Sequence, residues 1–244
     1  MTGSSVERTG TVTPVTTDFA MPDPRASAAR RITTRRSALR AFVGDGSPWV
    51  IAGATALAVG ARRQAGRVGR GDVAAVAAVV VAEPFVEWLL HTRVLHARPV
   101  TVAGQVIDLG AGHRAHHREP DRVEQVLLGG RYAVADSAAI AVGIHALGAL
   151  ATAVLGGNRR AVTRSALVAG YGALMTYEWT HLLMHTAYRP RSRWFRGLRT
   201  NHRLHHYRNE RQWFGITSNL GDRLLGTLPA SSTEVPLSPT ARSL

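Results

Sequence analysis

The sequence contains no cysteine and no lysine. Without cysteine the chain forms no disulfide and offers no thiolate to zinc, to an iron–sulfur cluster or to a nucleophilic reaction. Any metal ion must therefore be bound by His, Asp or Glu, which are ligand types that suit Fe, Zn, Cu and Mn. All 30 basic residues are arginine, and together with abundant Ala, Gly and Val this composition favours a GC-rich, bacterial source.

The chain of 244 residues carries a formal net charge of +14. So basic a protein binds nucleic acid or an anionic membrane surface, and composition alone does not choose between them. The mean hydropathy is −0.04, close to zero. This value averages polar ends with apolar internal segments, so it does not indicate a soluble protein.

Both ends of the chain differ in composition from the middle. Residues 1–40 are rich in Thr, Ser, Pro and Arg and poor in large apolar residues, which predicts a disordered basic tail. They contain no apolar core of a cleaved signal peptide. Residues 229–244 are predicted to form a second disordered tail. The domain that folds is expected to span residues 41–228.

Four apolar segments lie between the tails, at 48–61, 73–90, 132–156 and 161–185. A bilayer core requires about 20 mostly apolar residues per helix, a length that the last two reach, the second nearly reaches and the first falls short of. Four buried helices of a soluble bundle are the alternative. The segments are dense in Gly and Ala and lack a regular polar stripe, which favours membrane helices. We therefore expect an all-α integral membrane protein with about four transmembrane helices.

The distribution of arginine predicts the orientation of these helices. The N-terminal tail, the 98–131 loop with its approach, and the C-terminal tail hold 23 of the 30 arginines, and they lie on one side of a four-helix topology. Positive loops face the cytoplasm, so this side is expected to be cytoplasmic. Four arginines between residues 62 and 70 fall on the opposite side and weaken the argument.

Histidine provides the most specific signal in the sequence. Ten of the 11 histidines fall in four tight clusters, and only His145 stands apart, where we expect a packed or hydrogen-bonded helix residue. The clusters are H-x4-H, H-x2-H-H, H-x3-H and H-x2-H-H, formed in turn by His91 and His96, by His113, His116 and His117, by His181 and His185, and by His202, His205 and His206.

The spacing within most clusters places the imidazoles on one face of a helix. Residues three or four apart share a face, so we expect His181 and His185 to point the same way. The same is expected of His113 with His116 and His117, and of His202 with His205 and His206. His91 and His96 are five residues apart, about 140° out of phase on an α-helix. Either they bind different metal ions or the helix ends between them.

The arrangement is repeated along the chain. Each paired cluster follows an apolar segment, and an H-x2-H-H motif begins 17 residues after it, from His96 to His113 and from His185 to His202. A storage tract or a pH sensor would not produce two identical motifs at identical offsets. We therefore predict two half-sites that together bind two metal ions with about five imidazoles each.

Neutral imidazoles leave the charge of two divalent ions uncompensated, so carboxylates are expected nearby to orient the ligands. Glu87 lies one turn before His91, and Glu178 lies three residues before His181. Both stand in or beside an apolar segment, where a carboxylate is costly and usually functional. Glu83 extends the first stripe, and Asp222 is a further candidate. The alternative is that these acids only cap helices or pair with arginine at the membrane interface.

The four clusters resemble those of the fatty acid hydroxylase/sterol desaturase superfamily of membrane di-iron enzymes, and their order is most similar to its fatty acid 2-hydroxylase branch. Further similarity to that branch lies in His205-His206-Tyr207-Arg208-Asn209, in Phe214-Gly215-Ile216-Thr217-Ser218, and in Asp222 and Gly226-Thr227. The resemblance covers about residues 72–228. Its ten-histidine pattern is highly specific for the superfamily and less specific for the substrate.

The resemblance implies four membrane helices under a cytosolic helical cap that binds two Fe ions, with Zn possible in a purified form. It also implies O2 as co-substrate, a lipid substrate and two external electrons for hydroxylation of an unactivated C–H bond. The sequence has no motif of a fused haem domain, so we expect a separate electron donor of the ferredoxin or cytochrome b5 type with its reductase. The metal site is then expected on the cytoplasmic side of a bacterial cell membrane.

Two alternatives remain open. A carotenoid or sterol hydroxylase or desaturase of the same superfamily shares the histidine pattern, although residues 207–227 favour an acyl substrate. The second is a non-catalytic basic protein that binds metal and nucleic acid or a membrane surface. The arginines flank apolar segments, as juxtamembrane charges do, so no nucleic-acid partner is expected.

Overall fold

The structure is a computed structural model, and it describes residues 28–155 and 158–241. Most of the expected N-terminal disorder, at residues 1–27, and residues 242–244 of the expected C-terminal tail lie outside the described residues. The described part of the chain is mostly helical, as the sequence predicts.

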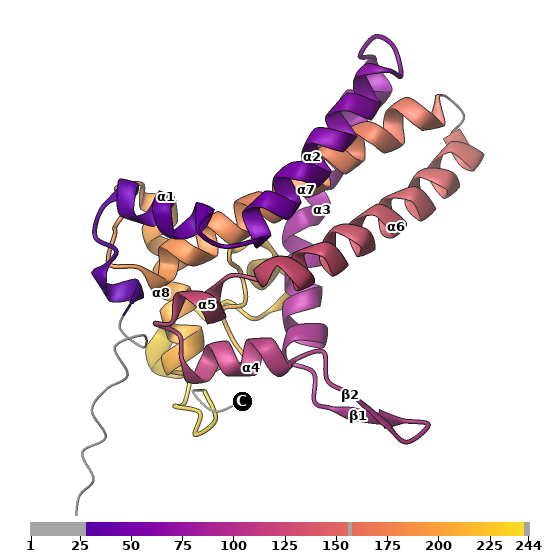
Figure 1. Cartoon of the computed structure of the whole chain (residues 1–244). Coiled ribbons are helices and arrows are strands. Elements are labelled where there is room, and N and C mark those ends of the chain that lie inside the picture. The colour runs from indigo at the N-terminus through magenta and orange to yellow at the C-terminus, as the bar shows by residue number, and fades with distance from the viewer. Residues whose placement is uncertain (1–27, 156–157, 242–244) are drawn as a thin grey trace, which may run out of the picture.

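Long helices form the body of the molecule, and shorter helices cover one end of it (Figure 1). The long helices are α2 (Ser47–Arg63), α3 (Arg70–Leu90), α6 (Gly129–Leu155) and α7 (Arg159–His185). The shorter ones are α1 (Arg35–Val43), α4 (Ala111–Arg118), α5 (Val123–Val126), α8 (Arg193–Tyr207) and α9 (Leu220–Leu225), with single helical turns η1 (Ala29–Arg31), η2 (His91–Leu95) and η3 (Ser232–Glu234).

Helix α7 is the centre of a four-helix bundle, because α2, α3 and α6 all pack against it. One cluster of buried apolar side chains joins α2, α6 and α7 and includes Ile51, Ala133 and Leu167. At Gly170 of α7, a Cβ atom would lie within 3.0 Å of side-chain atoms of two isoleucines of α6. The absence of a side chain there lets the two helices approach closely, as helices in membranes often do.

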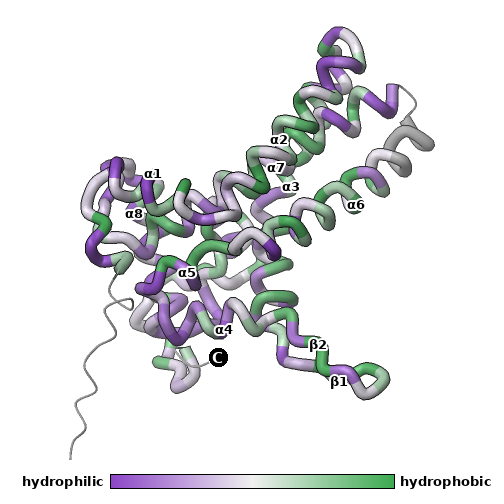
Figure 2. The backbone as a smooth tube through the Cα atoms, in the orientation of Figure 1, coloured by the Kyte–Doolittle hydropathy of each residue, from purple (hydrophilic) through white to green (hydrophobic). Residues whose placement is uncertain are grey.

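Two helical segments are long and apolar enough to cross a membrane, Arg70–Leu95 and Val123–Gly148. A third arises if α1 and α2, which meet at a bend of 76°, count as one span. Helix α7 is not among them, although the sequence predicts a span there. Its polar residues Thr163, Ser165 and Glu178 are buried in the bundle, so α7 is surrounded by protein and does not need an apolar surface. Figure 2 shows the apolar residues along the long helices.

An ion pair joins α2, α3 and α7 at the end of the bundle away from the short helices. The Arg62 guanidinium donates from Nε to Asp72 Oδ1 over 2.7 Å and from Nη2 to Asp72 Oδ2 over 2.8 Å. The Ser165 hydroxyl donates to the same carboxylate over 2.6 Å. The charge of Arg62 is therefore neutralised inside the bundle. Only three of the four arginines between residues 62 and 70 then count against the predicted orientation.

The short helices form a cap with its own apolar core. Ile32, Ala38, Phe195 and Leu198 come from the N-terminal segment and α8, and they pack against the end of α7 at Leu183 and against Ile216 of the following loop. The backbone N–H of Tyr188 donates to Ile32 O over 2.7 Å. Residues 28–40 thus pack on the cap in a part of the chain where the sequence predicts disorder.

The C-terminal segment also packs on the cap. Val235 and Ala241 are buried, and Ser238 N–H donates to Arg208 O over 2.7 Å. The Thr240 hydroxyl donates to Glu210 Oε1 over 2.7 Å. Residues 229–241 therefore have tertiary contacts where the sequence analysis expects a disordered tail, because buried polar groups of α8 and the following turn provide partners for them.

One hairpin departs from the expected all-α architecture. β1 (Val100–Val102) pairs antiparallel with β2 (Gln105–Ile107). Ala103 and Gly104 join the strands, both at positive φ, as a tight two-residue hairpin turn requires. The hairpin lies between His96 and His113 in the sequence and extends away from the helical body (Figure 1).

Candidate metal centre

The ten clustered histidines form two compact groups of five at the junction of the bundle and the cap. Within each group, one ring nitrogen from every histidine lies within 4.8 Å of all the others. The first group consists of His91, His96, His113, His117 and His205, and the second consists of His116, His181, His185, His202 and His206. His145, in contrast, is exposed and hydrogen-bonds the Ala141 carbonyl one turn earlier, outside both groups.

Each group contains four imidazoles from one half of the sequence and one from the other half. His205 comes from the second half but lies in the first group, and His116 comes from the first half but lies in the second. The sequence predicts two half-sites, each built from one helix end and its own downstream motif. The structure instead mixes them, because each H-H pair places neighbouring side chains on different faces of its helix.

The five-residue spacing of His91 and His96 is explained by a change of helix type. Residues His91–Leu95 form a turn of π-helix, closed by a hydrogen bond from His96 N–H to His91 O of 3.2 Å. An i→i+5 turn brings residues five apart nearly above one another, and such turns are frequent at functional sites. The two rings lie 5.1 Å apart in the same group. The structure thus contradicts the expectation of separate metal ions, because both rings lie in one group. It agrees with the expectation of a helix end, because the last helical turn ends at Leu95, between the two histidines.

Backbone carbonyl groups fix the orientation of three rings in the first group. The Nδ1 atoms of His91, His117 and His205 lie 2.6, 2.9 and 2.7 Å from the carbonyl oxygens of Phe214, Ala241 and Gln212. When Nδ1–H donates to the carbonyl, the ring carries its proton on Nδ1, and the lone pair of Nε2 is free to bind a metal ion. The Nε2 atom of His205 is buried and has no hydrogen-bond partner among the described residues. These rings therefore direct metal-binding nitrogens toward one point.

The second group contains buried ring nitrogens that have no hydrogen-bond partner among the described residues. Both ring nitrogens of His116 and both of His206 lack hydrogen-bond partners among the described residues, and so does Nδ1 of His202. A buried polar atom without a partner costs free energy comparable to a lost hydrogen bond. Five imidazoles within 4.8 Å of one another, several of them unpaired, fit a divalent transition-metal ion.

Burial keeps these rings neutral. Desolvation is the main reason that the pKa of His96 falls to about 3 and that of His117 to about 4. Burial likewise lowers the pKa of His113, His202 and His206 well below the ordinary value, with neighbouring imidazoles adding to the effect. Because a histidine binds metal only when it is neutral, these rings are competent ligands at pH 7.

Two of the predicted carboxylates, Asp222 and Glu87, hydrogen-bond the 214–217 loop, whose Phe214 carbonyl orients His91. Asp222 accepts hydrogen bonds from the N–H groups of Phe214 and Gly215, over 2.9 and 2.7 Å. Glu87 accepts from Ile216 N–H over 2.5 Å and from the Thr217 hydroxyl over 2.6 Å. The loop between these contacts carries the Phe214 carbonyl that holds His91. Both carboxylates thus contact the backbone that holds His91, and neither contacts the ring.

Glu83 and Glu178 have other partners. Glu83 accepts from the Thr217 hydroxyl over 2.8 Å, beside Glu87. Glu178 is fully buried, and its Oε2 accepts from the Ser47 hydroxyl over 2.6 Å and from Leu128 N–H over 3.1 Å. These contacts join α7 to the starts of α2 and α6. Within the described part of the chain, Glu178 hydrogen-bonds no histidine.

Several functional contacts could not be identified from the sequence. The carbonyls of Gln212, Phe214 and Ala241 belong to residues whose side-chain type gives no indication of the role. Thr217, whose hydroxyl lies within donating distance of both Glu83 and Glu87, is in the stretch that carries the family resemblance. That stretch was the only available signal, and it did not assign a role to Thr217.

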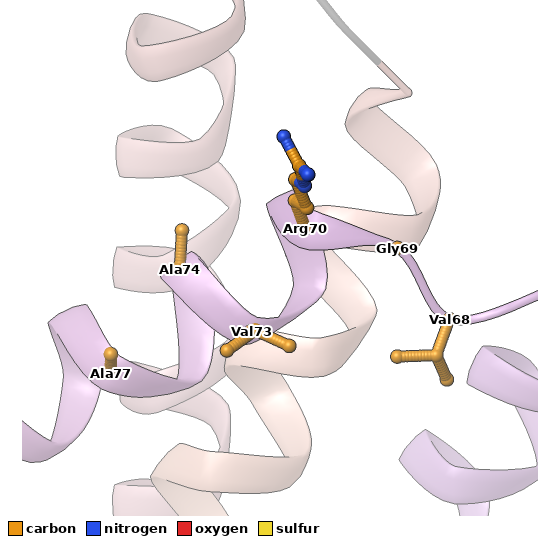
Figure 3. Close-up of a pocket in the computed structure, with 6 residues that line it drawn as sticks. All are labelled: Val68, Gly69, Arg70, Val73, Ala74 and Ala77. Atoms are coloured by element: carbon orange, nitrogen blue, oxygen red, sulfur yellow. The ribbon is translucent and has the colours of Figure 1, made fainter.

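The surface of the described residues has hollows, two of which lie at the start of α3 and beside the second histidine group. The larger, of about 570 Å³, is at the start of α3 and is lined by small apolar residues with Arg70 (Figure 3), away from the histidines. The second, of about 350 Å³, adjoins the second histidine group. Its lining includes His185, His202 and His206 together with Arg30, Arg189, Arg199 and Arg203. The second hollow therefore gives solvent a basic approach to the candidate metal centre.

Comparison with known proteins agrees with this arrangement. The family model described as fatty acid hydroxylase matches residues 76–227. The dihydroceramide fatty acyl 2-hydroxylase FAH2 of Arabidopsis thaliana is 36% identical over 81 residues, which are 33% of this chain and 29% of that protein. The chain thus matches less than a third of that relative's length. The hydroxylase domain of the solved Scs7p structure superposes with a TM-score of 0.58 at 19% identity, over 80% of this chain and 70% of that one, which shows a shared fold.

Proposed function

Because this chain belongs to the fatty acid hydroxylase family, we propose that it is a membrane di-iron enzyme that uses O2 to hydroxylate a lipid acyl chain, at or near C2. The balanced reaction converts a C–H bond, O2, two electrons and two protons into a C–OH group and water. Each histidine group would hold one iron ion, and the bound iron would supply the activation of O2 that no amino-acid side chain provides. The observation that carries the proposal is the convergence of ten imidazoles, most of them buried, into two groups of five.

The residues of the chain have separable roles in this proposal. The ten histidines bind the two ions, and the Phe214, Gln212 and Ala241 carbonyls hold three of the rings in the ligating tautomer. Glu87 and Asp222 hold the 214–217 backbone in place. Burial of most of the rings keeps the ligands neutral.

We further propose that α2, α3, α6 and α7 are four membrane spans, with the cap and the metal centre on the cytoplasmic side of a bacterial cell membrane. Two of these spans pass the length and hydropathy criterion outright. The excess of arginine in the N-terminal segment, the 98–131 loop and the C-terminal segment supports the orientation, and the pairing of Arg62 with Asp72 reduces the opposing charge.

The electrons are proposed to come from a separate ferredoxin or cytochrome b5 type donor with its reductase. The basic hollow beside His202 and His206 is the described approach to the second group, and its arginines favour an acidic donor. Replacing Arg203 with Glu should lower donor-driven turnover and weaken its dependence on salt, while single-turnover activity after chemical reduction should be unchanged. Arg191→Glu, an exposed change outside the hollow, is the matched control.

Lipid profiling tests the proposed reaction. Cells that express the protein should contain 2-hydroxy acyl lipids, and cells that express His116→Ala should not. The match to a dihydroceramide fatty acyl 2-hydroxylase favours this product over a hydroxylated carotenoid or sterol. Hydroxylated carotenoids or sterols without 2-hydroxy acyl species would replace the proposal with the second candidate. Release of the protein from membranes by high salt without detergent would instead support a non-catalytic surface protein.

A further inference from the structure

Among the described elements, the β1–β2 hairpin packs against no other helix or strand to any large extent. It leaves η2 after His96 and returns to α4 before His113, so it connects two members of the first histidine group. Figure 1 shows it extending away from the lower end of α3. Its strands pair with each other and make no extensive contact with another described helix or strand.

One face of the hairpin is apolar and exposed. Directly paired residues of antiparallel strands share a face, and the register pairs Val100 with Ile107 and Val102 with Gln105. Val100 is 54% exposed, Val102 55% and Ile107 42%. Thr101 and Val106 lie on the opposite face. Three branched apolar side chains are therefore presented together on one side.

Such a surface is unfavourable in water. A two-stranded hairpin is at most marginally stable on its own, and burial of an apolar face against another surface is what usually stabilises it. Clustered exposed apolar residues mark a site of interaction with protein or membrane. Val100, Val102 and Ile107 therefore require an occupant.

The charge of the neighbouring residues and the connection of the hairpin to a membrane-length helix identify that occupant. The hairpin follows directly from Arg70–Leu95, one of the two segments long and apolar enough to cross a membrane. Arg93 and Arg98 precede the hairpin and are exposed, and residues 93–107 contain no acidic side chain. The next acid, Asp108, forms an ion pair with Arg114. Basic residues beside an apolar face at the end of a membrane span match an anionic lipid surface.

We propose that the β1–β2 hairpin lies in the headgroup layer of the membrane that α3 spans, with Val100, Val102 and Ile107 toward the acyl chains and Arg93 and Arg98 at anionic headgroups. The outer edges of both strands carry backbone groups without strand partners, and these groups require water or polar headgroups. The hairpin therefore lies in the headgroup layer and does not enter the hydrocarbon core.

This placement has a consequence for the metal centre. Because the hairpin joins His96 to His113, its contact with the membrane fixes the depth of the first histidine group relative to the lipid. An acyl chain can then reach that group without leaving the bilayer. The inference rests on the proposed membrane topology, so the experiment must separate failure of the hairpin from failure of the span.

The absence of cysteine makes a labelling test direct. Val102→Cys, Val80→Cys in the middle of α3 and Leu237→Cys in the C-terminal segment each introduce one thiol at an exposed residue. The full-length, metal-loaded variants are labelled with bimane and placed in phosphatidylcholine–phosphatidylglycerol liposomes. Quenching is measured with lipid nitroxides on the headgroup or the acyl chain and with aqueous iodide. Metal content equal to that of the unmodified protein verifies the fold.

The expected results differ between the three positions. The Val102 label should be quenched several-fold more by the headgroup nitroxide than by iodide, the Val80 label by the acyl-chain nitroxide, and the Leu237 label by iodide alone. Equal iodide quenching at Val102 and Leu237 would overturn the proposal, and so would protection of Val102 from every quencher, which indicates a protein partner. A Val80 label accessible to iodide would overturn the span and the hairpin together.

A second measurement tests the role of charge. Arg93→Gln with Arg98→Gln, combined with Val102→Cys, should reduce headgroup quenching in liposomes that contain phosphatidylglycerol. In liposomes of phosphatidylcholine alone the same double change should have little effect. An equal effect in both kinds of liposome would overturn the assignment of these arginines to anionic headgroups.

Discussion

His205 and His206 are consecutive residues of α8, but their imidazoles belong to different groups of five, with ring centroids 5.7 Å apart. Successive side chains of an α-helix point about 100° apart, so one H-H pair can serve two sites only if those sites are neighbours. His116 and His117 do the same in α4. The two H-H pairs therefore determine that the groups lie side by side.

This exchange predicts which variants share a phenotype. His117→Ala and His205→Ala come from opposite halves of the sequence, but both should empty the first group and retain metal in the second. Each purified variant should lose about one of two bound irons, since a metal ion is held only by its complete ligand set. Iron analysis with Mössbauer spectroscopy measures this, and the two variants should give the same residual spectrum.

The corresponding changes in the second group, His116→Ala and His206→Ala, should give the complementary spectrum, and all four should abolish hydroxylation. His145→Ala is the control and should retain both metal ions and activity. Matching spectra for His116→Ala and His117→Ala would contradict the grouping.

Asp222 should affect metal binding through the backbone. Asp222→Asn removes a charged acceptor from the Phe214 and Gly215 N–H groups and so loosens the carbonyl that holds His91. Loss of such an indirect partner typically weakens metal affinity by about 10–100-fold. Competition with a chelator measures this change. Arg223→Gln, at the exposed neighbouring position, should leave the affinity unchanged.

The C-terminal segment should stabilise the first group. The Ala241 carbonyl accepts from His117, and deletion of residues 238–244 removes that acceptor together with the Thr240 contact to Glu210. We expect weaker iron binding in the first group and unchanged binding in the second. Chelator-release kinetics resolve the two populations. Leu237→Ala, which alters an exposed side chain of the same segment, is the matched control. Equally weakened iron binding in both groups would mean that the deletion acts through the fold as a whole.

The Arg62–Asp72 pair should stabilise the bundle without affecting the metal centre. Asp72→Asn leaves a buried guanidinium without its counter-charge, which is strongly destabilising. The midpoint of thermal unfolding in detergent should fall by an amount on the order of 5 °C, with bound iron unchanged at low temperature. Arg63→Gln, one residue along and exposed, should leave the midpoint unchanged.

The histidine motifs made much of the metal centre predictable from the sequence. Helical periodicity places residues three and four apart on one face, and the repeated 17-residue interval indicated two metal ions. The four apolar segments indicated the bundle. Length and apolar composition were less informative at α7, because a helix that packs against three others can bury polar residues such as Thr163, Ser165 and Glu178.

By itself the sequence determined which residues are able to bind metal, because residue chemistry and local helical spacing are properties of short stretches of chain. Only the tertiary structure decided which five imidazoles share a group, that a π-turn aligns His91 with His96, and that the Ala241 carbonyl faces His117. These relationships join residues up to 124 positions apart. They depend on how the helices cross and where loops return, and no local pattern encodes that geometry.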